Sequence, residues 1–111
     1  MKTFLTWTSP DAVRAFVAAK GSAWIFKHST RCPISAEAER EFMRHPEDAA
    51  LSVYRVLVVE NRPTSNAIAE ALGVEHQSPQ AILVRDGRAV WNASHWDVTR
   101  EKLKEAEAGA V

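Results

Sequence analysis

The sequence holds a single cysteine, Cys32, among its 111 residues, so no disulfide can form within one chain. Any disulfide chemistry at this residue must be intermolecular. The chain also has no excess of charge of either sign, because 14 basic residues balance 14 acidic ones. General nucleic-acid-binding proteins usually carry a basic excess, so we expect no nucleic-acid partner.

Long apolar stretches are missing as well. No run approaches the roughly 20 residues of a membrane span. The segment from Met1 to Leu5 contains no apolar core of a signal peptide. We therefore expect no membrane partner and a location in the reducing cytoplasm. The length suits one hydrophobic core, so residues 1–111 are expected to form a single domain.

Apolar segments alternate with amphipathic ones along the chain, which predicts an α/β fold. The expected strands are 4–7, 23–28, 53–59, 81–85 and 89–92; the expected helices start at Ser9-Pro10, run from Pro33 to about His45, run from Pro63 to Leu72 and cover 97–107. Asp86-Gly87 predicts a tight hairpin turn, and Gly21 is suited to a left-handed helix cap. The order β-α-β-α-β-α-β-β-α, with a cysteine after the second strand, is similar to the thioredoxin arrangement: a central mixed sheet flanked by helices.

The chemistry is expected at the segment around Cys32. Pro33 suits the first position of a helix, which makes Cys32 the N-cap. Its sulfur then faces unpaired N–H groups, whose dipoles favour the thiolate over the thiol. Arg31 adds positive potential. Ser35 stands where a dithiol CxxC motif has its second cysteine; a hydroxyl can hydrogen-bond a thiolate but cannot resolve a mixed disulfide, which indicates monothiol exchange.

The same residues also allow interpretations other than a reactive thiol. A lone cysteine is most often a small buried hydrophobe. Here it follows a strand, precedes a proline at a helix start and has polar neighbours, which favours a reactive thiol. Four histidines suggest a metal. His28 and Cys32, however, have no CxxC or HxxxH partner, so we expect no metal site and no resident cofactor.

Ligands of α/β proteins bind where the carboxyl ends of parallel strands meet at one sheet edge. Cys32 belongs to that edge, as does the loop after the third strand. Reversal of the hairpin strands brings the start of the fourth and the end of the fifth to the same place. The candidate binding residues at this edge are Arg31, Arg62, Ser78, Pro79, Ser94 and His95.

Taken together, several motifs resemble the YtxJ-type family of monothiol bacilliredoxins. The matching pieces are Thr30 with Cys32-Pro33-Ile34-Ser35, Arg62-Pro63 with Ser65-Asn66, Gly73-Val74, His76 with Ser78-Pro79-Gln80, and Val90-Trp91 with Ala93-Ser94-His95. The resemblance implies a thioredoxin fold and removal of bacillithiol from S-bacillithiolated client proteins. It also implies that Cys32 is the attacking thiol and that Pro79 is a cis proline.

The resemblance makes bacillithiol the thiol co-substrate. Its malate group carries carboxylates, and the cations available to pair with them are Arg31, Lys27, Arg62 and His95. Phe26 stands on the strand where thioredoxins carry a buried acid, which suits a monothiol enzyme. Trp24 and Trp96 are expected to add aromatic bulk near the two ends of the site.

Two other functions stay open. Fe–S-bridging monothiol glutaredoxins use a CGFS motif, whose glycine lets a cluster approach, and the bulkier Pro33-Ile34 argues against that class. A non-enzymatic thioredoxin-fold adaptor, in which Cys32 is incidental, is the second alternative. Slow alkylation of Cys32 at pH 6 would favour the adaptor, and a brown colour after anaerobic purification would favour the cluster protein.

Overall fold

A computed structural model of the chain describes residues 4–44 and 51–109. These residues form five strands, four α-helices and one 3₁₀ helix, in the predicted order. The strands are β1 (Phe4–Thr6), β2 (Ala23–His28), β3 (Val53–Leu57), β4 (Gln80–Arg85) and β5 (Arg88–Ser94). The helices are α1 (Pro10–Ala18), α2 (Pro33–Arg44), α3 (Arg62–Leu72) and α4 (Arg100–Gly109), with the 3₁₀ helix η1 (His95–Asp97) before α4.

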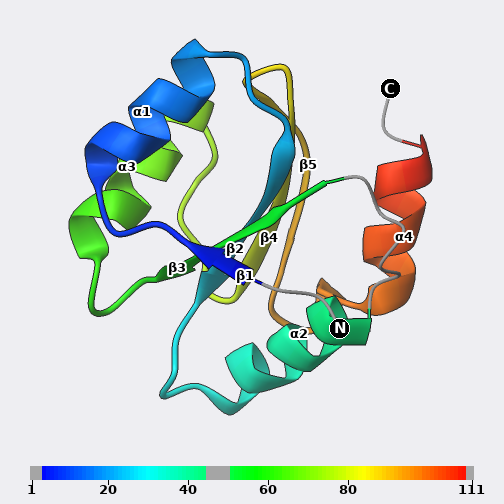
Figure 1. Ribbon diagram of the computed structural model, residues 1–111. Helices are drawn as coiled ribbons and strands as arrows, with labels where there is room; N and C mark the ends of the chain where they lie inside the picture. The colour runs from blue at the N-terminus through cyan, green and yellow to red at the C-terminus, as the bar shows by residue number, and fades with distance from the viewer. Residues whose placement is uncertain (1–3, 45–50, 110–111) are drawn as a thin grey trace.

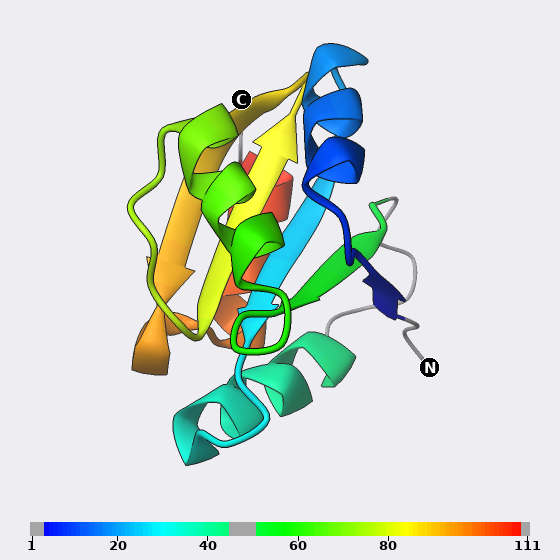
Figure 2. The ribbon, with the colours of Figure 1, turned by 90° about the vertical axis from the view of Figure 1, so that its left-hand side faces the viewer.

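The strands form one mixed sheet in the order β1-β3-β2-β4-β5. β3 pairs in parallel with both β1 and β2, whereas β4 runs antiparallel to β2 and β5 antiparallel to β4. The predicted α/β class with a mixed sheet is therefore confirmed. Gln80 pairs with Lys27 on one side and with Ser94 on the other, so the start of β4 and the end of β5 reach the edge at which β2 ends (Figure 2).

Helices cover both faces of the sheet: α1 and α3 lie on one face, and α2 and α4 on the other (Figure 1). The central strand β2 is buried at every residue, as expected for a strand between two helical layers. Alternation along β2 sends Trp24 and Phe26 into the cluster under α2 and α4, and Ile25 into the cluster under α1 and α3.

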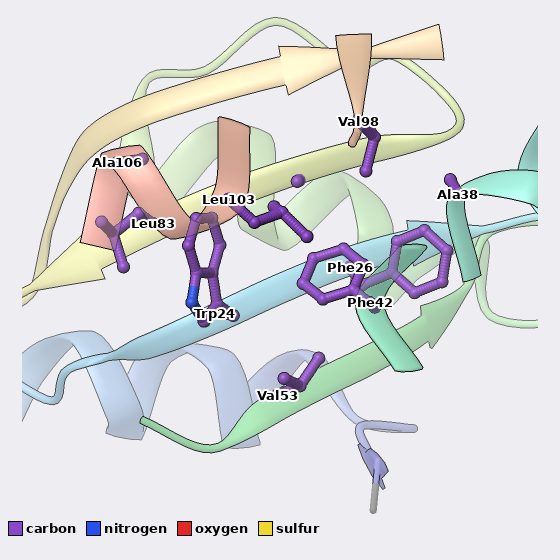
Figure 3. Packing of buried hydrophobic residues seen from close by; sticks show 10 residues of the cluster. Trp24, Phe26, Ala38, Phe42, Val53, Leu83, Val98, Leu103 and Ala106 are labelled. Carbon is purple, nitrogen blue, oxygen red and sulfur yellow. The ribbon is translucent and has the colours of Figure 1, made fainter. Parts of the chain in front are cut away.

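Aromatic rings dominate the core beneath α2 and α4 (Figure 3). The Phe42 ring lies 4.8 Å from that of Phe26 and 5.8 Å from that of Trp24, between centroids. Trp24 is fully buried and also meets Trp91 edge-on. The expectation that Trp24 lies at an end of the site is therefore wrong: it anchors α2 to the sheet, which holds the cysteine-bearing helix in place.

The end of α1 differs from the sequence prediction. Lys20, not Gly21, takes the left-handed conformation, with φ 56. The N–H groups of Lys20 and Gly21 bond back to the carbonyls of Val17 and Phe16, which closes a Schellman cap. Gly21 is required for another reason, because a Cβ added there would overlap the Phe16 ring.

The end of β3 and the start of α4 also differ from the sequence prediction. β3 ends at Leu57 and not at Val59, because its partner β2 ends opposite, at His28, and the chain then turns. The last helix begins at Arg100 and not at Asp97, because Thr99 caps it: the Thr99 hydroxyl accepts from the Lys102 N–H at 3.2 Å.

The remaining ends of helices and strands differ little from the prediction. α2 ends at Arg44, and the expected helix end at His45 lies outside the described residues. Asp86 and Gly87 form the predicted hairpin turn, both with positive φ. β5 extends beyond the expected 89–92 at both ends. Within the described ranges, no helix is long and apolar enough to cross a membrane.

Candidate active site

Cys32 lies immediately before α2, in the loop that follows β2. Its carbonyl accepts from the Ala36 N–H at 3.1 Å, and its own N–H donates to the Ser29 carbonyl at 3.3 Å. These bonds and Pro33 at the first helical position give Cys32 the predicted N-cap place. The thiol is free and the residue partly exposed. The residue therefore lies at the positive end of the helix dipole, and its partial exposure allows contact with a disulfide.

Ser35 is fully buried, one helical turn into α2. Its Oγ accepts from the Ser29 N–H at 2.9 Å and lies 3.0 Å from Nδ1 of His28. The Ser35 hydroxyl and the His28 nitrogen share one hydrogen bond, whose direction follows the tautomer of the ring. The expected use of this hydroxyl, bonding to the thiolate, is therefore not the arrangement present. Ser35 instead joins the first turn of α2 to the start of the cysteine loop.

His28 extends this network beneath the loop. Its Nε2 lies 3.6 Å from Oε2 of Glu39, which also accepts from Nη1 of Arg55 at 2.8 Å. Burial lowers the pKa of His28; Glu39 acts against that effect and Arg55 adds to it. The neutral ring links β2 to α2. The sequence suggests His28 as a source of positive potential near Cys32 and, with Cys32, as a metal ligand that lacks partners. Nothing in the pattern specifies its contacts with Ser35 and Glu39.

The predicted meeting of loops at one sheet edge is present (Figure 2). The Ser78–Pro79 peptide bond is cis, as predicted. The Pro79 carbonyl accepts from the His95 N–H at 2.9 Å, which ties the start of β4 to the end of β5. Ser94 faces Gln80 in the ladder. Ser78 Oγ is buried and makes no hydrogen bond to any residue that the structure describes.

The four cations proposed for this edge divide into two groups. Arg31, Arg62 and His95 are exposed. Lys27 is fully buried, so its expected role as a direct partner of a substrate carboxylate is wrong. Its Nζ bonds to Nδ1 of His76 at 3.1 Å, and burial lowers the pKa of the ammonium to about 8. His76 was matched only as part of a motif. A lysine that follows four apolar residues in a strand marks Lys27 as unusual, but it does not identify His76 as its partner.

A groove of about 500 Å³ adjoins the cysteine loop. Pro33 and Ile34 form one of its walls, and His95 and Trp96 form another. His95 has φ 55, a backbone conformation unusual for a residue with a side chain, and the next residue, Trp96, is 67% exposed. A larger space of about 860 Å³ lies between β5 and α4 and is not lined by the cysteine loop.

Within residues 4–44 and 51–109, no three His, Cys, Asp or Glu side chains form a group that could hold a metal ion. The side chains gathered at the sheet edge are a thiol, hydroxyls, imidazoles and guanidinium groups. Their chemistry is that of a nucleophile with binding groups for a polar, anionic partner.

Comparison with solved structures identifies the fold. The chain is similar to "a putative oxidoreductase with a thioredoxin fold", with 32% identity, a TM-score of 0.83 and coverage of 94% of this chain and 93% of the other. It also resembles the thioredoxin of Malassezia sympodialis, with 17% identity, a TM-score of 0.74 and coverage of 99% and 92%. A thioredoxin variant from Halobacterium salinarum matches at 19% identity, with a TM-score of 0.74 and coverage of 96% and 89%.

The thioredoxin fold, together with a cysteine at the start of α2, defines a thiol oxidoreductase. The family model of the monothiol bacilliredoxin BrxC matches residues 6–103. The chain therefore belongs to the monothiol bacilliredoxin family.

Proposed function

We propose that this protein removes bacillithiol from S-bacillithiolated proteins, with Cys32 as its nucleophile and bacillithiol as its thiol co-substrate. The observation that carries the proposal is the pairing of a partly exposed Cys32 at the start of α2 with a buried serine at position 35. One thiol per chain permits capture of a thiol but no internal resolution. The match to the BrxC family supports bacillithiol as that thiol.

The reaction has two balanced steps. The Cys32 thiolate attacks the bacillithiol sulfur of the client's mixed disulfide; a new S–S bond forms, the old one breaks, and the client leaves as a thiolate that takes up a proton. A second thiol then attacks the Cys32 adduct, and bacillithiol departs in a new disulfide with that thiol. One S–S bond is present before and after the two exchanges: the client's sulfur is reduced, the external thiol's sulfur is oxidised, and no further oxidant or reductant is needed.

Each site residue has a defined part in this proposal. Cys32 supplies the nucleophile at the start of α2, and Arg31 precedes it in the loop. Ser35 holds the loop through Ser29 and His28. We assign binding of the mixed disulfide to residues at the same sheet edge: Arg62, Ser78, Pro79, Ser94 and His95.

The test is release of bacillithiol from a model client protein, followed by intact mass. Wild type should release it in the presence of free thiol, and Cys32→Ser should not. A matched control is the double variant Cys32→Ser with Ser52→Cys, which keeps one thiol per chain. It moves the thiol to the residue before β3, at the edge of the sheet opposite to the one that bears Cys32. This control should also be inactive, and activity in it would refute a specific role for position 32.

Ser35→Cys gives an independent check. A second thiol one helical turn from Cys32 should resolve the adduct internally and release bacillithiol without an external thiol. No release by wild type, with Cys32→Ser indistinguishable from it, would leave the adaptor alternative as the better description. A brown protein with Fe–S absorbance after anaerobic purification would favour the cluster alternative.

A further inference from the structure

A buried lysine lies beside the loop that precedes the cis proline. Lys27 lies near the end of the central strand β2, opposite Gln80. Its side chain is buried on the face of the sheet that α3 covers. Its Nζ contacts Nδ1 of His76 at 3.1 Å, and the Ser65 hydroxyl contacts the same nitrogen at 3.3 Å. A buried ammonium is costly unless it is paired, so packing alone does not account for a lysine at this position.

These contacts fix the tautomer of His76. A lysine ammonium has donors only, so Nδ1 of His76 accepts from it. Burial and the two cations Lys27 and Arg62 lower the pKa of His76, which keeps the ring neutral. The ring proton is then on Nε2. His76 is exposed, and Nε2 bonds to none of the residues that the structure describes. The ring therefore presents an N–H donor to solvent.

The charges around His76 favour an anion. Arg62 is exposed at the first residue of α3, and Lys27 lies behind the ring. Among the described residues, both of the charged groups that shift the pKa of His76 are cations. A neutral donor between two positive charges matches the needs of a carboxylate.

The same place belongs to the edge that bears the thiol. His76 precedes Pro79 in the loop that leads into β4, and the Pro79 carbonyl is bonded to His95. The end of β3, from which the chain turns toward Arg62, is tied to the end of β2 through the bond from the Val58 N–H to the His28 carbonyl. Figure 2 shows the end of the loop before β4, the end of β5 and the loops after β2 and β3 toward the same lower edge of the sheet.

We propose that His76 is a specificity-determining residue, whose Nε2–H donates to a carboxylate of the low-molecular-weight thiol carried on Cys32. Arg62 supplies charge to the same carboxylate. Lys27 is a positioning residue that holds the His76 ring in the donating tautomer and does not itself touch the thiol. The inference rests on the proposed function and extends it to the part of the thiol remote from sulfur.

The experiment compares two adducts of Cys32 at equilibrium. Bacillithiol and an analogue that lacks the malate group compete for Cys32: one thiolate attacks the adduct, the S–S bond is exchanged and the other thiolate leaves, with no net oxidation. Intact mass gives the ratio. Wild type should prefer bacillithiol by about tenfold, the size of one charge-assisted hydrogen bond.

Substitutions separate the contribution of His76 from that of Lys27. His76→Phe should abolish the preference, and His76→Gln should retain part of it, because its amide N–H lies near the position of Nε2. Lys27→Met should reduce the preference although His76 is present. Lys104→Met, which removes an exposed lysine on α4, is the matched control and should leave the preference unchanged.

Side-chain ¹⁵N spectra test the positioning role. His76 should carry its proton on Nε2 in wild type and become a mixture of tautomers in Lys27→Met. A proton on Nδ1 in wild type, or the same preference in wild type and His76→Phe, would overturn the inference. An intact, His76-dependent preference in a protein that releases no thiol from a client would uphold the inference and refute the proposed function.

Discussion

Replacement of Lys27 with methionine is expected to stabilise the folded protein at neutral pH. Burial lowers the pKa of Lys27 from 10.5 to about 8, a difference equivalent to about 3 kcal/mol of folding free energy. Methionine removes the charge and keeps most of the volume. Loss of the bond to His76 offsets about 1 kcal/mol. The free energy of unfolding at pH 7 should therefore rise by roughly 2 kcal/mol.

The stability difference between Lys27→Met and wild type should fall as the pH rises. Below pH 8, Lys27 is protonated in both states, and the cost of burying its charge is fully present. Between about 8 and 10.5 the unfolded chain binds more protons than the folded one, so wild-type stability rises with pH. Lys27→Met lacks this contribution. Its advantage should shrink through that window and disappear near the upper end.

Urea unfolding followed by circular dichroism at pH 7, 8.5 and 10 measures the difference. Only the difference between the two proteins matters, because it cancels groups that titrate in both. Lys104→Met serves again as the exposed control, with no comparable change expected. A difference that stays constant from pH 7 to 10, or a Lys27→Met protein less stable than wild type at pH 7, would refute the reasoning.

Three further outcomes are expected. Ser35→Ala should lower the free energy of unfolding by about 1–3 kcal/mol in urea titrations, because it removes the acceptor of the part-buried Ser29 N–H; an unchanged midpoint would show that this bond contributes nothing. Arg62→Ala and His95→Ala should each slow exchange with a bacillithiolated protein about tenfold more than exchange with a small neutral disulfide; equal slowing on both would remove their carboxylate role. Gly21→Ala should cost about 1–3 kcal/mol by thermal or urea unfolding, because its Cβ displaces the Phe16 ring; wild-type stability would mean that the ring moves freely.

The sequence was sufficient for features set by local chemistry and strand direction. A cysteine before a proline predicted the N-cap of α2. Parallel and antiparallel pairing predicted that Pro79 and His95 meet, which their hydrogen bond confirms. The cis state of Pro79 followed from the family resemblance, because statistics alone would have favoured trans.

What the sequence could not supply were contacts between distant positions. Lys27 and His76 are 49 residues apart, and alternation along β2 gives only the face of the sheet, not the partner across it. Ser35 was interpreted through the cysteine motif, although its hydroxyl is occupied by Ser29 and His28. The predicted start of α4 was wrong because a single hydrogen bond, from the Lys102 N–H to the Thr99 hydroxyl, determines where that helix begins.

The exposure of Trp96 has a practical consequence for observing this protein. Trp96 adjoins Pro33 and Ile34 in the groove beside the thiol and is 67% exposed, whereas Trp7 and Trp24 are buried. Because Pro33 and Ile34 directly follow Cys32, we expect a molecule attached to Cys32 to change the surroundings of Trp96 and to leave those of Trp7 and Trp24 intact. Its fluorescence, read against their constant emission, gives an intrinsic optical signal of whether the cysteine is loaded or empty. Arrival and departure of the thiol can then be followed in real time without a label.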